Sequence, residues 1–165
     1  MTAVTQQTEA DLEGWRLFLR AHSQVMRRLE AQLMAEHNLP LPWYDVLVQL
    51  AQAPDRRLRM TELASRVLLS RSGLTRLVDR LEREKLVERA ACPTDARVTH
   101  AVLTDAGLQR LREASPTHLR SIAEHVTGRL GSRDLAELAR LMTKLMPAPM
   151  AAECAETLES AEGCP

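Results

Sequence analysis

The sequence has few aromatic residues and few cysteines. Its 165 residues include two Trp, one Tyr, one Phe and three Cys. A hydrophobic core must therefore be built from leucine, alanine, valine and methionine, a composition that favours helices. The three cysteines, Cys92, Cys154 and Cys164, lack the paired spacing of a disulfide framework or a metal site, which suits a reducing compartment.

Several functional signals are also missing from the sequence. It has no run of 18 apolar residues that could span a membrane, and its polar, acidic start does not resemble a signal peptide, so we expect a cytoplasmic protein. There is no glycine-rich phosphate loop, no GxSxG, no HExxH and no DxDxDG. We therefore expect the protein not to be an enzyme and to hold no cofactor and no metal ion.

The formal net charge is zero, yet the charge is unevenly distributed along the chain. Residues 56–97 contain eleven Lys and Arg against six acidic residues, a local charge of +5. Residues 148–165 contain four Glu and no basic residue. Because attraction to phosphates depends on the local patch rather than on the total, residues 56–97 are the part suited to a nucleic acid.

An amphipathic helix is predicted at the start of residues 70–97. Leu74, Leu77, Val78 and Leu81 fall at the i, i+3, i+4 and i+7 positions of one helical face. Ser70 precedes them as a candidate N-cap, since its hydroxyl can accept a backbone N–H. The opposite face carries Ser72, Thr75, Arg76, Asp79 and Arg83.

The flanking segments suggest how this helix is used. A short helix capped by Thr61 precedes it, and a tight turn between the two helices fits a helix-turn-helix, whose second helix enters the major groove of DNA. Strands are predicted at residues 86–90 and 98–103, joined by a turn, with a third short strand at residues 56–60. The fold class is therefore mainly α with a small β-wing (α+β), a winged helix-turn-helix.

These residues resemble the multiple-antibiotic-resistance regulator (MarR) family of winged-helix transcription factors. The matching motifs are SxSxxTRxVDRLExxxLVxR at residues 70–89, the wing D-x-R at residues 95–97, and LTDAG at residues 103–107. The resemblance extends more loosely over residues 12–146. Two positions depart from the family pattern: Lys85 stands where Gly is common at the exit of the helix, and Ala96 stands where the wing often has a second Arg.

The resemblance implies a sequence-specific, DNA-binding transcriptional regulator. In the family such a protein is commonly a homodimeric repressor that a small, often aromatic, ligand releases from an inverted-repeat operator. Arg80 and Arg83 either contact DNA or pair with acidic neighbours, and Asp79 is expected in a salt bridge. The candidate DNA-binding residues are Ser70, Arg71, Ser72, Thr75, Arg76, Arg80 and Arg97.

The rest of the chain is expected to frame the dimer. A flexible N-terminus (1–10) precedes a single domain (11–146), and a flexible acidic tail follows (147–165). Within the domain, residues 38–103 form the DNA-binding lobe and residues 11–37 and 104–146 form dimerisation helices, with Pro40 and Pro42 separating the first of these from a helix that starts at Trp43. The long apolar stripes of the terminal helices exceed what a small lobe can cover, so a second copy is expected to bury them.

Regulation is less well defined by the sequence. Trp15, His22, Trp43 and Tyr44 are candidates for a ligand-binding crevice, although aromatic residues near a hinge also serve as ordinary core. Two alternatives remain open. Cys92 lies in the wing near several arginines and could sense oxidants, and a winged helix can instead serve as a protein-interaction module.

Overall fold

The computed structural model describes residues 9–67, 69–92 and 95–146, and for residues 10, 11, 92 and 95–97 it describes the backbone only. The chain divides into two compact units, Met1–Ile122 and Ala123–Pro165. The first contains α1 (Glu9–His37), α2 (Leu41–Gln52), a 3₁₀ turn (Pro54–Arg56), β1 (Arg57–Arg59), α3 (Met60–Arg66), α4 (Arg71–Arg83), β2 (Val87–Cys92), β3 (Asp95–Leu103) and α5 (Asp105–Ile122). The described part of the second contains a π-helical segment (Ala123–Thr127) and α6 (Ser132–Leu145).

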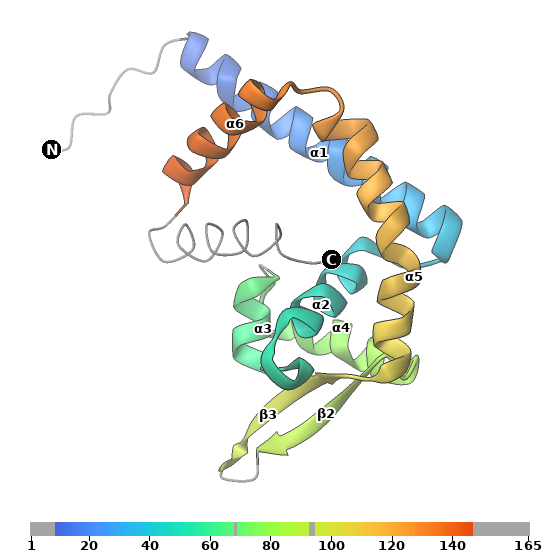
Figure 1. The fold of residues 1–165 in the computed structure, drawn as a ribbon. Coiled ribbons are helices and arrows are strands. Elements are labelled where there is room, and N and C mark those ends of the chain that lie inside the picture. The colour runs from blue at the N-terminus through green and yellow to red at the C-terminus, as the bar shows by residue number, and fades with distance from the viewer. Residues whose placement is uncertain (1–8, 68, 93–94, 147–165) are drawn as a thin grey trace, which may run out of the picture. The chain divides into compact units, whose positions relative to one another are not determined.

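The strands form one antiparallel sheet in the order β1-β3-β2. Val87 lies opposite Leu103 and Leu58 lies opposite Ala101, so β3 is the central strand. Figure 1 shows the β2–β3 hairpin projecting away from the helices that precede it. The predicted fold class, mainly α with a small β-wing, is confirmed.

The core of the first unit joins this sheet to α2, α3 and α4. Leu74, Val78 and Leu81 of α4 are at most 1% exposed and belong to the same buried cluster as Leu50 of α2 and Leu63 of α3. These α4 residues belong to the stripe predicted from the sequence. Because the stripe fixes which face of α4 points inward, it also fixes which face points outward.

A carboxylate from α1 holds the start of α2. The Leu41 backbone N–H donates to Glu30 Oε2 at 2.6 Å, and the N-cap residue Pro40 supplies no side-chain cap. The prediction that this helix starts at Trp43 was wrong, because it begins at Leu41 and places Pro42 in its first turn. Proline is tolerated there, since the N–H groups of a first turn have no intrahelical acceptor.

The two predicted caps of the helix-turn-helix have different outcomes. Ser70 caps α4 as expected, with the Gly73 backbone N–H donating to Ser70 Oγ at 3.1 Å. The prediction for Thr61 was wrong: α3 already begins at Met60, and its N-cap residue, Arg59, makes no side-chain cap bond. Of the two helices of the helix-turn-helix, only α4, which carries the arginine-rich face, has a side-chain cap at its start.

The exit of α4 is a left-handed turn centred on Lys85, whose φ is 61°. The Lys85 N–H donates to the Glu82 carbonyl and the Leu86 N–H donates to the Leu81 carbonyl, both at 2.9 Å. This pair of bonds is the Schellman closure, in which the left-handed position is usually glycine. The chain adopts it with a lysine, in agreement with the departure noted in the sequence.

We expect Lys85→Gly to raise the free energy of unfolding by about 0.5–1 kcal/mol. Glycine removes the Cβ clash of the left-handed conformation, and its greater freedom in the unfolded chain offsets part of the gain. Urea unfolding followed by circular dichroism measures the change. Glu84→Gly is the matched control, because Glu84 has an ordinary φ of −82° and should lose stability instead.

The helices α1 and α6 each leave several apolar side chains uncovered in the single chain. On α1, Trp15 is 55% exposed and Phe18 is 38% exposed. On α6, which has no buried residue, Leu141 is 42% and Leu145 is 70% exposed. Large apolar surfaces of this kind mark sites of association rather than ordinary solvent-facing surface.

Candidate nucleic-acid interface

The candidate interface is built on the outward face of α4. All six residues predicted there are exposed, opposite the buried stripe of the same helix. The guanidinium groups of Arg71, Arg76 and Arg80 make no hydrogen bond or ion pair with any residue that the structure describes. The complete set on this face is Ser70, Arg71, Ser72, Thr75, Arg76 and Arg80.

The hydroxyl groups of this face are partly engaged by the helix itself. Ser70 Oγ accepts the Gly73 N–H and lies 3.3 Å from Ser72 Oγ. Thr75 Oγ1 donates to the Arg71 carbonyl oxygen at 2.9 Å. The helix therefore orients these small side chains, while the longer arginines beside them extend into solvent.

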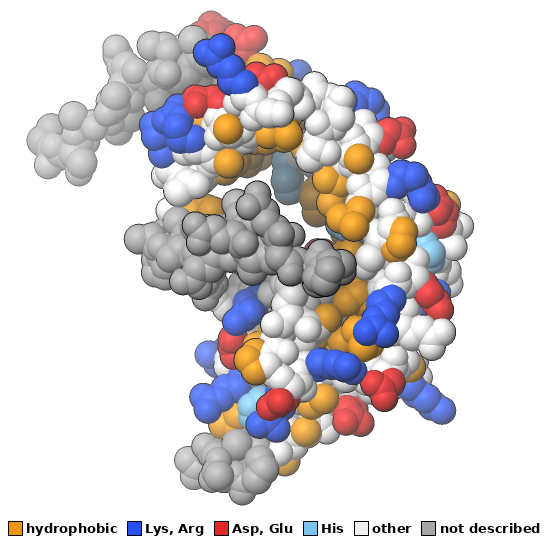
Figure 2. Space-filling model, in the orientation of Figure 1, with side chains coloured by type: hydrophobic (Ala, Val, Ile, Leu, Met, Phe, Trp, Pro, Cys, Tyr) orange, Lys and Arg blue, Asp and Glu red, His pale blue; other side chains and the backbone are white. Residues whose placement is uncertain are grey.

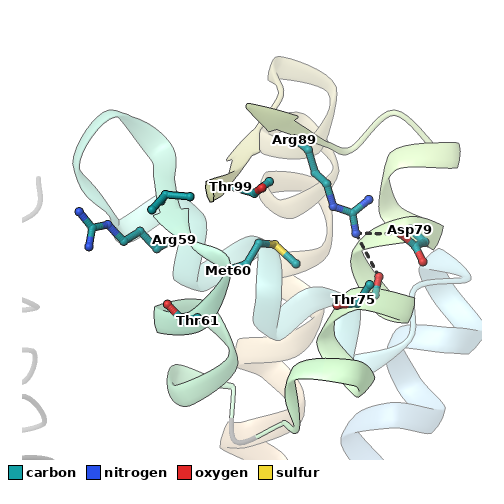
Figure 3. Close-up of a pocket in the computed structure, with 8 residues that line it drawn as sticks. Arg59, Met60, Thr61, Thr75, Asp79, Arg89 and Thr99 are labelled. Atoms are coloured by element: carbon teal, nitrogen blue, oxygen red, sulfur yellow. Dashed lines mark hydrogen bonds and ion pairs between the residues drawn. The ribbon is translucent and has the colours of Figure 1, made fainter. Parts of the chain in front are cut away.

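Arg89 of β2 ties the wing to α4, a role that sequence reasoning did not assign. Its guanidinium lies 2.7 Å from Asp79 Oδ1 and donates to the Thr75 carbonyl at 3.2 Å (Figure 3). It also pairs with Glu82. The Arg89 backbone N–H donates to the other oxygen of Glu82 at 2.9 Å. The alternation of strand residues could have indicated this inward position. Arg89 lies two residues after the buried Val87, so the two side chains share the inward face of β2.

The acidic residues of α4 are therefore structural. The prediction that Asp79 forms a salt bridge is confirmed, although its partner is Arg89 rather than Arg80 or Arg83. Arg83 Nε instead donates to the Asp79 backbone carbonyl at 3.1 Å. Asp79 and Glu82 both point to Arg89, whose one positive charge offsets one of their two negative charges.

A cavity of about 510 Å³ opens between α4, the start of α3 and the wing. Thr75 and Asp79 form its α4 wall, and Thr99 lies on the wing side (Figure 3). On the face shown in Figure 2, basic and acidic side chains are interspersed rather than separated.

Part of the wing lies outside the described side chains. Arg97 belongs to β3 and Cys92 to β2, but only their backbone is described. The predicted DNA contact of Arg97 and the redox alternative for Cys92 therefore concern side chains beyond the described set. The last described backbone pair of β2 and β3 is Cys92 opposite Asp95.

The four candidate ligand-binding residues lie in different surroundings within the first unit. On α1, the Trp15 and Phe18 rings lie 5.8 Å apart and the Phe18 and His22 rings lie 6.4 Å apart, forming an exposed aromatic row. Trp43 lines a cavity of about 350 Å³ near the α1–α2 connection. Tyr44, its neighbour in sequence, lines a different cavity of about 320 Å³.

Two further observations concern the described residues only. Within the described ranges, no three His, Cys, Asp or Glu side chains gather in a way that could hold a metal ion. None of the described helices combines the length and apolarity required to cross a bilayer.

Comparison with known proteins agrees with this geometry. A family model described as MarR family matches residues 37–98. The HTH-type transcriptional regulator MhqR of Bacillus subtilis is 30% identical over 120 residues, which cover 73% of this chain and 81% of MhqR. Among solved structures, Sco3205 from Streptomyces coelicolor, a MarR family transcriptional regulator in complex with DNA, is similar with a TM-score of 0.80 and 35% identity over 87% of this chain and 96% of its own. AbsC, a MarR family transcriptional regulator from the same organism, has a TM-score of 0.80 and 30% identity over 93% of this chain and 99% of its own.

Proposed function

Because this chain belongs to the MarR family of transcriptional regulators, we propose that it controls transcription by placing α4 in the major groove of an operator. The observation that carries the proposal is the exposed face of α4, where Arg71, Arg76 and Arg80 present guanidinium groups that no described residue pairs with. Arginine can bond two acceptors on a guanine edge, whereas serine and threonine bond phosphates or bases. The complex of the similar regulator Sco3205 with DNA supports this assignment.

The proposed assembly is a symmetric homodimer that represses transcription from an inverted repeat. The exposed apolar residues of α1 and α6 support it, because a second copy would bury them. Two-fold symmetry would place the two α4 helices about one DNA turn, ~34 Å, apart. Sedimentation equilibrium of the purified protein measures the assembly directly, and a monomer at micromolar concentration would contradict it.

The wing would add a contact beyond the major groove. Arg97 is the proposed wing cation, since a long side chain near a hairpin tip can meet a phosphate or enter the minor groove. Release from DNA would follow the binding of a small ligand to the first unit. A coupling free energy of ~1–3 kcal/mol between ligand and DNA would suffice for such a switch.

Arg76→Ala is expected to weaken operator binding by ~1–3 kcal/mol, because the lost guanidinium would leave a base edge or phosphate without its partner. The operator is first recovered by in vitro selection of random duplexes with the unaltered protein. Fluorescence anisotropy at fixed salt then gives the dissociation constants.

Arg112→Ala is the matched control, since Arg112 is also an exposed helical arginine but lies on α5. It removes the same charge away from the α4 face and should change affinity by less than twofold. Equal affinities for Arg76→Ala and the unaltered protein would reject the assignment of α4 as the recognition helix.

A further inference from the structure

The cavity beside Tyr44 joins three helices of the first unit. It has a volume of about 320 Å³, near the lower end for small-molecule sites. α2 contributes most of its wall, the end of α3 contributes a second side, and α5 contributes one ring. The residues that matter below are Tyr44, Asp45, Val48, Arg66, Val67 and His118.

Two polar groups of this cavity lack partners. No hydrogen bond or ion pair reaches the Asp45 carboxylate from residues 9–67, 69–92 or 95–146. His118 Nδ1 is buried and likewise has no partner among those residues. The Tyr44 ring lies 4.4 Å from the His118 ring, and its hydroxyl donates to Ser115 Oγ at 3.3 Å. The Asp45 carboxylate is partly exposed and lines the cavity, so a donor that enters the cavity can reach it.

The charges around the cavity favour a cation. Burial, reinforced by the nearby Glu30 carboxylate, raises the pKa of Asp45 to about 6, so Asp45 is ionised at neutral pH at a cost in solvation. Arg66 is held by Glu62 at 3.0 Å, which balances its charge. Burial lowers the pKa of His118, which favours the neutral ring, so His118 adds no positive charge that would repel a cation.

We propose that this cavity binds a small organic cation, a protonated amine attached to an apolar body. The ammonium group would pair with the Asp45 carboxylate, which lines the cavity. The apolar body would rest against the Tyr44 ring and against Val48 and Val67. An ammonium group carries three donors and no acceptor, so it supplies both the charge and the hydrogen bonds that the Asp45 carboxylate lacks.

The position of the cavity suggests how a bound ligand would change the affinity for DNA. This step rests on the proposed function. Val67 is the C-cap of α3, at the turn that leads to Ser70 and α4. The Leu69 N–H donates to the Ala64 carbonyl at 3.0 Å, so this turn is fastened to α3. A ligand that bridges α2, α5 and the end of α3 would bias the position of the turn and hence of the recognition helix.

The test uses the full chain and three probes of matched shape: 2-phenylethylamine, 2-phenylethanol and phenylacetate. Isothermal titration calorimetry at pH 7.5 is expected to show binding of the amine, with affinity at least tenfold weaker for the alcohol and no binding of the carboxylate. Asp45→Asn should weaken amine binding at least tenfold. Asp55→Asn, which makes the same change at an exposed residue of the 3₁₀ turn, should leave it unaltered.

A pH series gives an independent readout. Amine affinity should fall as the pH drops through about 6, because protonated Asp45 loses its charge. The charged or titratable groups around Asp45 are Glu30 from α1, Arg66 from α3 and His118 from α5. Asp45→Asn should abolish this dependence.

Several results would overturn the proposal. The first is binding of phenylacetate that equals or exceeds that of the amine, and the second is no binding of the amine at 10 mM. The third is an amine affinity that Asp45→Asn leaves unchanged. The fourth is conversion of the dimer to a monomer by Asp45→Asn, which would assign Asp45 to the contact with a second copy. The melting temperature of ligand-free Asp45→Asn should not fall at pH 7.5, since the variant removes a poorly solvated charge. Ligand-free Asp45→Asn should also bind the operator like the unaltered protein, so a failure of DNA binding itself is distinguishable from a failure at this cavity.

Discussion

Replacing Gly107 with alanine is expected to lower the free energy of unfolding by about 2 kcal/mol, although alanine is normally the better helix former. A Cβ at this position would lie 2.0 Å from the Leu86 carbonyl oxygen and 2.7 Å from Leu103 Cδ1. The first of these is a backbone atom that cannot move aside cheaply. Overpacking of this kind costs about 3 kcal/mol and outweighs the ~1 kcal/mol gain in helix propensity.

The surroundings of Gly107 explain why the clash cannot relax. Thr104 Oγ1 accepts the Gly107 N–H at 3.0 Å and lies 2.8 Å from the Lys85 carbonyl and 3.0 Å from the Leu86 carbonyl. One hydroxyl thus caps α5 and anchors it to the segment between α4 and β2. Moving Gly107 away from Leu86 would break this anchor as well.

Gly14→Ala is the control for Gly107→Ala. A Cβ at Gly14 on α1 meets nothing within 4 Å among the described residues, so alanine there should stabilise the protein by about 0.5–1 kcal/mol. Urea unfolding at one fixed protein concentration measures both variants, since an oligomer gains stability with concentration. Changes of the same sign at the two glycines would contradict the steric explanation.

Arg89→Ala should have the second largest effect, a loss of about 2 kcal/mol of stability together with roughly tenfold weaker operator binding. The Arg89 side chain is only 27% exposed and holds both Asp79 and Glu82. Its removal leaves two partly buried carboxylates without their cation. Breaking a fully buried ion pair costs ~3–5 kcal/mol, and the loss expected here is smaller because both carboxylates are partly exposed. α4 would lose its attachment to the wing, so its exposed arginines would be less well positioned.

Salt dependence separates this positioning role from direct DNA contact. Asp79 and Glu82 neutralise Arg89, so its removal should lower affinity without flattening the slope of log affinity against log salt. A slope that falls by about one unit would instead assign Arg89 to a phosphate. Arg83→Ala is the control for stability, because Arg83 is exposed and bonds only a carbonyl of its own helix. It should cost less than about 0.5 kcal/mol.

The sequence was sufficient to predict features that depend on near neighbours. The α4 stripe, the Ser70 cap and the wing follow from helical spacing, a single hydroxyl and alternating β-branched residues. The six residues expected on the outward face of α4 therefore lie where they were placed. Their contact with DNA stays a prediction, and so does that of Arg97.

Features that depend on packing between distant segments could not be predicted. Nothing near Leu41 in sequence indicates that Glu30 would satisfy its N–H. Nothing near Asp45 indicates that it would be desolvated beside Glu30 and line the same cavity as His118. The sequence drew attention to Tyr44 because of its aromatic ring. In the structure the neighbouring Asp45 is the more unusual residue, because its carboxylate is partly buried and has a raised pKa.

The hydroxyl of Thr75 has one further consequence. Its single hydroxyl proton is already donated to the Arg71 carbonyl, so what remains for a nucleobase is the two lone pairs of the hydroxyl oxygen and a methyl group. In the major groove, lone pairs can meet only the exocyclic amino groups of adenine N6 or cytosine N4, and the methyl can meet only the C5-methyl of thymine. While that bond persists, the Thr75 hydroxyl cannot donate to the acceptor atoms of guanine. If the preferred operator has guanine next to Thr75, this side chain must rotate before it can contact that base.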